Sequence, residues 1–199
     1  SRHDERVVTI LPISKEVQEN PEGHYLIFAT HEGIVKRSKL ADYTRINRNG
    51  KYALNFKSET DTLVAVREAT DEDHVVLVSK NGRACRFQPS HTKTSSDGTV
   101  SITVKVQGRV TAGVRGMSLK PGDRVVGMIA TSNEETSVLT LSKYEMANRS
   151  RLGAGSRHDV LDENAQPVID MKTETGNQYT YGSTETALVS VGLFNVYSE

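Results

Sequence analysis

The stretch YLIFATHEGIVKRSKL, from Tyr25 to Leu40, carries the pattern that decides the fold. An apolar run is followed by a short polar turn containing Gly33, and then by a second apolar run that becomes basic. β-Branched and aromatic residues on both sides of a short turn predict a β-hairpin. We expect the returning strand to direct its positive charges outward and to offer Ile34 and Val35 to a core.

This hairpin pattern recurs twice along the chain. HVVLVSKNGRACRF, residues 74–87, aligns with the first copy at an offset of 49, which places Arg86 on Arg37. SVLTLSKYEMANRSRL, residues 137–152, aligns at a further offset of 63, which places Arg149 at the same position. The shared arginine is therefore the residue that the repeat singles out.

A second element, a closing strand, also recurs along the chain. DTLVAV at residues 61–66 aligns with DRVVGM at 123–128 and with ERVVTI at 5–10, so an acidic residue precedes an apolar strand each time. The polar, Ser/Thr-rich insertion KTSSDGTVSITVKV, residues 93–106, accounts for the longer second offset. A period near 50 residues with about four strands indicates a propeller-like array, in which neighbouring blades supply each other's core.

The expected fold is therefore all-β, with an incomplete number of four-stranded blades. We expect the end of a blade at 14–23, complete blades at 24–70 and 71–132, and the start of another at 133–152. Strands are also expected at 6–13 and 52–56. Residues 153–199 are acidic and turn-rich, which predicts an irregular segment with a possible final strand at 187–196.

Charge is balanced overall but uneven along the chain. Lys plus Arg and Asp plus Glu each total 25, whereas residues 33–51 contain six basic residues and one acid. Residues 80–93 contain four basic residues and no acid, and residues 159–199 contain seven acids and one lysine. A polyanion would meet the local basic patches and not the average charge.

The single cysteine, Cys85, excludes a disulfide within the chain and favours a reducing compartment. No apolar run approaches the roughly 20 residues of a membrane span. The first residues lack the layout of a signal peptide. We expect a cytoplasmic protein.

No pattern of catalytic, metal-binding or cofactor-binding residues emerges. The histidines lack metal-site spacing, and no P-loop, dinucleotide-binding glycine motif or nucleophile elbow is present. Cys85 fits a buried small side chain better than a nucleophile. Asp61 and Asp123 fit turn residues that accept backbone N–H groups better than an acid–base pair.

The repeat resembles the C-terminal β-pinwheel domain of the DNA gyrase A subunit over roughly residues 4–152. The resemblance rests on DERVVTILPI, GIVKRSKL, DTLVAV, NGRACRF and, most specifically, GRVTAGVRGMSLKPGDRVVGM at residues 108–128. It implies blades that each lend an outer strand to a neighbour. It also implies a basic rim that binds and wraps duplex DNA near the nucleoid, in concert with the other parts of the gyrase A and B subunits.

The resemblance has limits. The family domain usually has about six blades, and its basic wrapping box has only an echo here in RINRNGK, residues 45–51. Nothing resembles a breakage domain or an ATP site, so the chain is expected to be a non-catalytic part of an ATP-dependent type II topoisomerase.

A row of Lys and Arg along such a rim would gain affinity for DNA by counterion release. The predicted DNA-binding residues are Lys36, Arg37, Lys39, Arg45, Arg48, Lys51, Arg83, Arg86, Lys93, Lys143, Arg149 and Arg151. The alternative for each is a charge that keeps a sheet edge soluble. Two other functions stay open: the equivalent domain of topoisomerase IV, against which the GVRG string argues, and a blade-type protein-interaction module. Neither a membrane nor a small-molecule substrate is expected.

Overall fold

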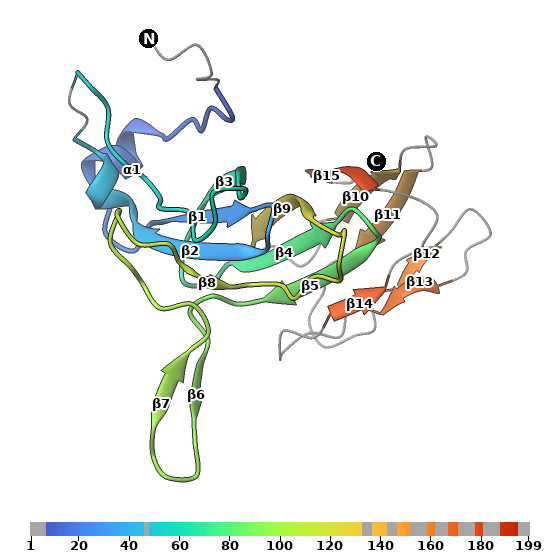
Figure 1. Ribbon diagram of the computed structural model, residues 1–199. Coiled ribbons are helices and arrows are strands. Elements are labelled where there is room, and N and C mark those ends of the chain that lie inside the picture. Colours follow the sequence, from blue (N-terminus) through green and yellow to red (C-terminus); the bar gives the residue numbers. More distant parts are fainter. Residues whose placement is uncertain are drawn as a thin grey trace, which may run out of the picture.

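A computed structural model describes residues 7–45 and 48–132, together with the backbone of six strands between residues 137 and 194. Three antiparallel sheets lie side by side (Figure 1). The order in the first sheet is β3-β1-β2-β8, formed by Leu63–Ala69, Tyr25–Thr30, Ile34–Lys39 and Val114–Arg115. The order in the second is β9-β4-β5-β14, formed by Val125–Thr131, His74–Ser79, Arg83–Phe87 and Gln178–Thr180.

The third sheet has the order β15-β10-β11-β12-β13. Its strands are Leu188–Phe194, Ser137–Ser142, Ala147–Arg151, Asp159–Leu161 and Pro167–Asp170. The all-β, propeller-like fold expected from the sequence is confirmed. The segment expected to be irregular contains the final strand, β15, and three further strands, so this part of the fold is richer in strands than the sequence indicates.

Strand register confirms the sequence repeat. The shared arginine lies opposite Ile27 in the first hairpin, opposite Val76 in the second and opposite Leu139 in the third. These three partners are separated by the same offsets, 49 and 63, as the arginines themselves. Each first strand also has a register shift against its closing strand at the equivalent place, next to Thr30, Ser79 and Ser142. The three copies are therefore one structural unit repeated.

Each of the first two sheets is completed by a strand from later in the chain. β8 pairs with β2, although it follows β5 of the second sheet, and β14 pairs with β5. We call residues 103–113, which lead from the second sheet back to the edge of the first, the crossover segment. This exchange of outer strands between neighbours is what the family resemblance implies.

One apolar core fills the space between the first two sheets. It combines Ile27 and Val35 from the first sheet with Leu77 and Phe87 from the second, and Met117 after β8 closes it. Ile34 and Val35 are buried, as predicted. A second cluster, around Leu26, Phe28, Leu40 and Val66, covers the opposite face of the first sheet. Because both faces are covered, even the polar residues of β2 are drawn into the interior.

The GVRG string owes its glycines to a close approach of backbones. Gly113 has a φ of +87°, and a Cβ atom there would overlap with the carbonyl oxygen of Val35. A Cβ atom on Gly116 would lie 2.5 Å from Cγ1 of Val35. The motif is therefore a packing requirement of the exchanged strand.

Several local predictions need correction. Residues 7–13 and 52–56 are not strands, and Val7 and Ile10 are 80% and 84% exposed. A short helix, α1 (Lys15–Glu19), follows instead, capped by Ser14, whose hydroxyl accepts from the amide of Val17. A 3-10 turn, η1 (Leu40–Tyr43), follows β2.

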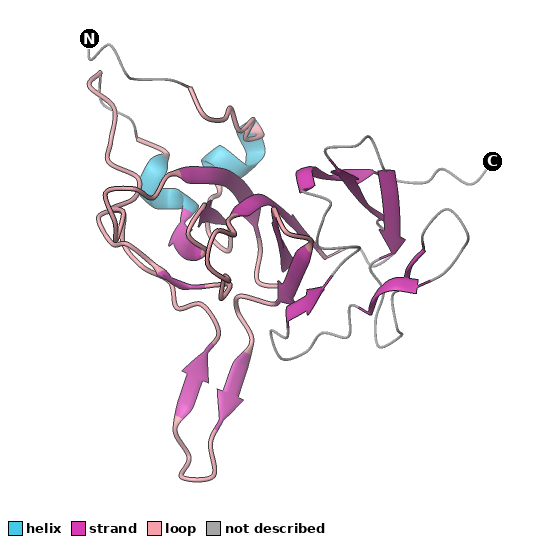
Figure 2. Ribbon diagram, turned by 45° about the vertical axis from the view of Figure 1, so that its right-hand side comes forward, coloured by secondary structure: helices cyan, strands magenta, loops and turns pink. Residues whose placement is uncertain are grey.

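The insertion at 93–106 forms a two-stranded hairpin of β6 (Thr92–Thr94) and β7 (Val100–Ile102). This hairpin stands clear of the sheets, and residues 91–103 are exposed throughout (Figure 2).

Candidate nucleic-acid interface

The arginine shared by the repeats is an interior residue in the two copies whose side chains are described. Arg37 is 4% exposed and Arg86 is 5% exposed. The Arg37 guanidinium lies 3.9 Å from the ring centroid of Tyr25 and donates to the carboxylate of Asp71. Arg86 donates from Nε to Nδ1 of His74, which is the equivalent of Tyr25 in the second copy. The expectation that β2 directs its charges outward is therefore wrong for Arg37, and this position does not present a free cation to DNA.

Lys36 is also interior, with 1% of its surface exposed. Its Nζ donates to the carbonyl oxygens of Ala53, Arg109 and Thr111, at 2.6, 2.6 and 3.3 Å. Burial, with the Arg109 charge adding to it, lowers the pKa of Lys36 from 10.5 to about 8, and Asp42 opposes that shift. Lys36 is thus a correction as well: it contacts main chain, not solvent.

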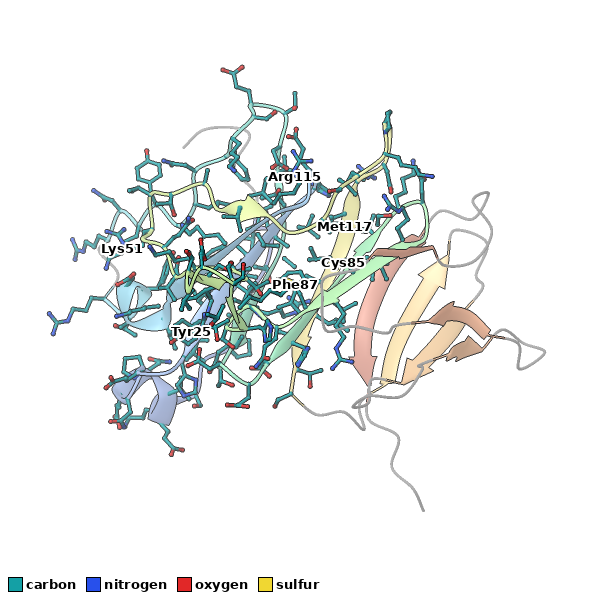
Figure 3. All side chains as sticks on the ribbon, turned by 90° about the horizontal axis from the view of Figure 1, so that it is seen from below. Tyr25, Lys51, Cys85, Phe87, Arg115 and Met117 are labelled. Carbon is teal, nitrogen blue, oxygen red and sulfur yellow. The ribbon has the colours of Figure 1, made fainter. Side chains whose placement is uncertain are left out.

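The remaining predicted cations of the first copy are on the surface. Lys39, Arg45 and Arg48 are exposed, and residues 46 and 47 between the two arginines lie outside the described residues. Lys51 is half-buried, with Nζ 3.4 Å from the carbonyl oxygen of Asp42. Figure 3 shows Lys51 at the margin of the molecule, away from Cys85 and Phe87 in the interior.

The crossover segment brings a cation that the sequence analysis did not choose. Arg109 donates from Nη1 to the carbonyl oxygen of Tyr52 at 3.3 Å. Asn55 also connects the same two stretches. Its backbone N–H donates to the carbonyl oxygen of Thr111, and its side-chain amide donates to the carbonyl oxygen of Val110. Arg109 therefore lies beside the loop that carries Lys51. Its position in the GRVTAGVRG string was visible in the sequence, but its distant partner was not.

Residues 39–57 and 105–115, which these contacts bring together, contain eight lysines and arginines and one acid, Asp42. Tyr52, 78% exposed, offers an aromatic ring on the same surface. We call this pair of stretches the basic surface. Its excess of positive charge suits a polyanion.

The other predicted residues are dispersed. Arg83 is half-buried and donates to the carbonyl oxygen of Ser118, and Lys93 is exposed on the β6–β7 hairpin. Arg149 and Arg151 lie on β11, whose backbone alone is described, and Lys143 lies outside the described residues.

The aspartates that precede the closing strands are turn acceptors, as predicted. Oδ1 of Asp61 accepts from the amides of Glu32 and Thr62. Oδ1 of Asp123 accepts from the equivalent amides of Asn81 and Arg124. They fasten a hairpin turn to a closing strand, which is a structural task.

Cys85 is 1% exposed, and burial raises the pKa of its thiol to about 11. It is the buried small side chain that the sequence predicts. Within the described ranges, no group of three His, Cys, Asp or Glu residues is placed to hold a metal ion. No helix in the part of the chain that the structure describes has the length and apolar character needed to cross a membrane.

A family model described as the DNA gyrase C-terminal domain, beta-propeller, matches residues 24–69 and 103–132. These ranges are the first three strands of the first sheet and the crossover with β8 and β9. The DNA gyrase A subunit of Staphylococcus epidermidis is 35% identical over 188 residues, and that of Staphylococcus aureus is 31% identical. Both alignments cover 88% of this chain, which spans only 19% of either relative.

Two solved structures share the fold. The C-terminal domain of DNA topoisomerase IV aligns with a TM-score of 0.62 at 20% identity, covering 98% of this chain and 68% of that one. The DNA gyrase A C-terminal domain aligns with a TM-score of 0.52 at 21% identity, covering 87% and 66%. Together with the register of the repeats and the exchanged strand, these findings confirm the resemblance drawn from the sequence: the chain belongs to the family of DNA gyrase C-terminal beta-propeller domains.

Proposed function

We propose that this chain binds duplex DNA through the basic surface and supports its wrapping, as a non-catalytic part of a type II topoisomerase of the gyrase kind. The single observation that carries the proposal is the joining of residues 39–57 to the crossover segment. It brings Arg109 beside the loop of Lys51, the loop that also carries the exposed Arg45 and Arg48.

Physical reasoning supports duplex DNA bound without regard to its sequence. Duplex DNA presents a regular row of phosphates, and cations that replace its counterions gain affinity without reading bases. A duplex that bends toward the basic surface brings more of its phosphates within reach of these cations. The two relatives named above are DNA gyrase A subunits, which supports DNA as the ligand.

A salt titration of binding to a duplex of about 40 base pairs tests the proposal. We expect the affinity to fall steeply between roughly 50 and 200 mM salt, whatever the duplex sequence. A neutral-surface variant, Arg45→Gln/Arg48→Gln/Lys51→Gln/Arg109→Gln, should bind more weakly. Its plot of log affinity against log salt should be shallower by about 3 to 4, or roughly 0.9 for each phosphate that is no longer neutralised.

A control removes three other charges, in Lys80→Gln/Lys120→Gln/Arg124→Gln. These residues lie at the turns beside Asp123, and none of them belongs to the basic surface. The control should keep the affinity and the salt slope of the unchanged chain. Equal losses in both variants would show that only net charge matters, and would overturn the assignment of the surface.

In the cell, we place the chain in the cytoplasm at the nucleoid, working with the other parts of the gyrase A and B subunits. The C-terminal domain of topoisomerase IV has the same fold, so the fold alone does not establish DNA wrapping. A topological assay distinguishes DNA wrapping from protein interaction. Relaxed plasmid closed by a relaxing topoisomerase in the presence of this chain should retain a linking-number change if DNA is wrapped. A protein-interaction module would leave the plasmid unchanged, and would tolerate the neutral-surface substitutions.

A further inference from the structure

Lys36 is a buried cation that does not belong to the basic surface. Its ammonium group has no carboxylate within ion-pair distance among the described residues; the nearest recorded partners are three main-chain carbonyls and the ring of Phe28, 5.3 Å away. A buried charge is costly unless several hydrogen bonds compensate it. In some proteins a buried polar group fixes one local geometry, and the hydrogen bonds of Lys36 join specific stretches of the chain.

The three carbonyls come from two stretches that are far apart in the sequence. Ala53 belongs to the loop after η1, while Arg109 and Thr111 belong to the crossover segment. Neither stretch is a strand, so neither is held by a ladder of backbone hydrogen bonds. The ammonium of Lys36, with its three donors, fixes both stretches to the same strand at once.

The neighbouring contacts act in the same direction. Tyr43 donates to the Ala53 carbonyl that Lys36 also contacts, at 3.1 Å. Gly113 brings the crossover so close to β2 that a Cβ atom there would lie 3.0 Å from Cβ of Lys36. The crossover is therefore seated directly over the lysine.

We propose that Lys36 is a positioning residue, which locks the loop at residues 51–55 to the crossover segment and so holds Lys51 and Arg109 at the spacing that DNA requires. The inference rests on the proposed function for its DNA-binding consequence, but the lock itself is a property of the fold. Lys36 touches no ligand in this scheme. It acts through the two stretches that carry the basic surface.

Substitution Lys36→Met tests the lock, because methionine keeps the length and the unbranched stem and removes the donors. Hydrogen–deuterium exchange on the whole chain should show faster exchange at residues 53–55 and 109–113, by about tenfold, the value of one lost hydrogen bond. Exchange in β4 and β9 should not change. An exposed control, Lys120→Met, should leave the exchange of both stretches as it is.

The DNA readout separates a positioning role from general destabilisation. In the unchanged chain, Lys36→Met should weaken duplex binding by about tenfold. In the neutral-surface variant the same substitution should weaken binding no further, because the cations that it would misplace are already gone. An equal loss in both backgrounds would overturn the positioning role.

The two proposals fail in different ways. If the neutral-surface variant binds DNA normally while Lys36→Met speeds exchange in both stretches, the lock stands and the proposed function is wrong. If exchange at 109–113 is unaffected by Lys36→Met, the lock is wrong, whatever happens to DNA binding. Should Lys36→Met not fold, Lys36→Gln keeps two donors on a shorter stem. It must then give a smaller rise in exchange at the same residues, and an unchanged rate there would contradict the lock.

Discussion

The first and second sheets share one backbone plan but fill an equivalent interior position in opposite ways. Lys36 lies opposite Phe28 in the first hairpin, and Cys85 lies opposite Leu77 in the second, at the common offset of 49. Both side chains are 1% exposed. Burial favours the neutral form of each, so it lowers the pKa of Lys36 to about 8 and raises the pKa of Cys85 to about 11.

The difference lies in what covers each position. Main-chain carbonyls of the crossover and the loop at residue 53 face Lys36, whereas apolar side chains of the shared core surround Cys85. One carbonyl, of Gly116, lies 3.7 Å from the thiol sulfur. The repeated sequence thus gives both sheets the same backbone path. The groups packed against each sheet determine whether a charged or an apolar side chain can be buried at a given position.

The largest effect is expected when a lysine is placed at the position of Cys85. We expect Cys85→Lys to lower the free energy of unfolding by at least about 3 kcal/mol, because an ammonium there would lie among the apolar side chains of the shared core. Cys85→Ala should cost only about 1 kcal/mol, the loss of a small buried group. Urea denaturation measures both, and a tolerated Cys85→Lys would contradict the account of the core.

A second test uses the glycine that seats the crossover on Lys36. Gly113→Ala should cost about 3 kcal/mol, because it combines a positive φ with an overlap against the Val35 carbonyl. Gly122→Ala is the matched control: its φ is +78°, and a Cβ atom there meets nothing within 4 Å, so about 1 kcal/mol is expected. Equal costs in thermal unfolding would show that the close approach is unimportant.

The turn aspartates allow a finer comparison. Oδ2 of Asp123 accepts from the hydroxyl of Ser79, whereas Oδ2 of Asp61 is buried without a partner. An Asp→Asn substitution that puts the amide nitrogen in place of Oδ2 therefore removes an acceptor that is used at Asp123 and unused at Asp61. Asp123→Asn should therefore cost about 1 kcal/mol more than Asp61→Asn in urea denaturation. The reverse order would refute this reading of the turns.

A further expected effect is a pH dependence of the difference between two variants. Between pH 8 and 10.5 the unfolded chain binds a proton at Lys36 that the folded chain has lost, so this residue makes folding more favourable as pH rises through that window. The charged groups near Lys36 are Arg109 and Asp42. The hydroxyl of Tyr43 donates to the carbonyl oxygen of Ala53, which Lys36 also contacts.

The measurement is the difference in free energy of unfolding between the unchanged chain and Lys36→Met. The value for the unchanged chain minus the value for Lys36→Met should rise by about 2 kcal/mol between pH 7.5 and 10, since the titration of other groups largely cancels in the difference. A difference that is constant or shrinks over this range would mean that Lys36 keeps an ordinary pKa.

The sequence predicts the repeat, its offsets and the turn aspartates because these depend on residues close together in the chain. The family resemblance implies that a strand is exchanged, but the local pattern does not show that β8 is this strand, since Val114 pairs with Val35 across the whole second hairpin. The sequence pattern does not predict the burial of Arg37 either. Alternation separates the two faces of a strand, but it does not show that both faces are covered.

The basic surface is partly predictable for the same physical reason. Arg45, Arg48 and Lys51 belong to a loop, and a charged loop is exposed by default. Arg109 joins them through a strand exchange that sequence spacing does not reveal. The equivalence of Arg37 and Arg86 is real, but it marks a contact inside each blade.

We propose that DNA meets the loop and the crossover together, and not the repeated arginine. Hydrogen–deuterium exchange of the whole chain with and without a duplex of about 40 base pairs would show where the duplex lies. Protection on DNA binding should fall on residues 41–57 and 105–115 at once and should disappear at high salt. Protection confined to other residues, or to one of the two stretches alone, would contradict the claim.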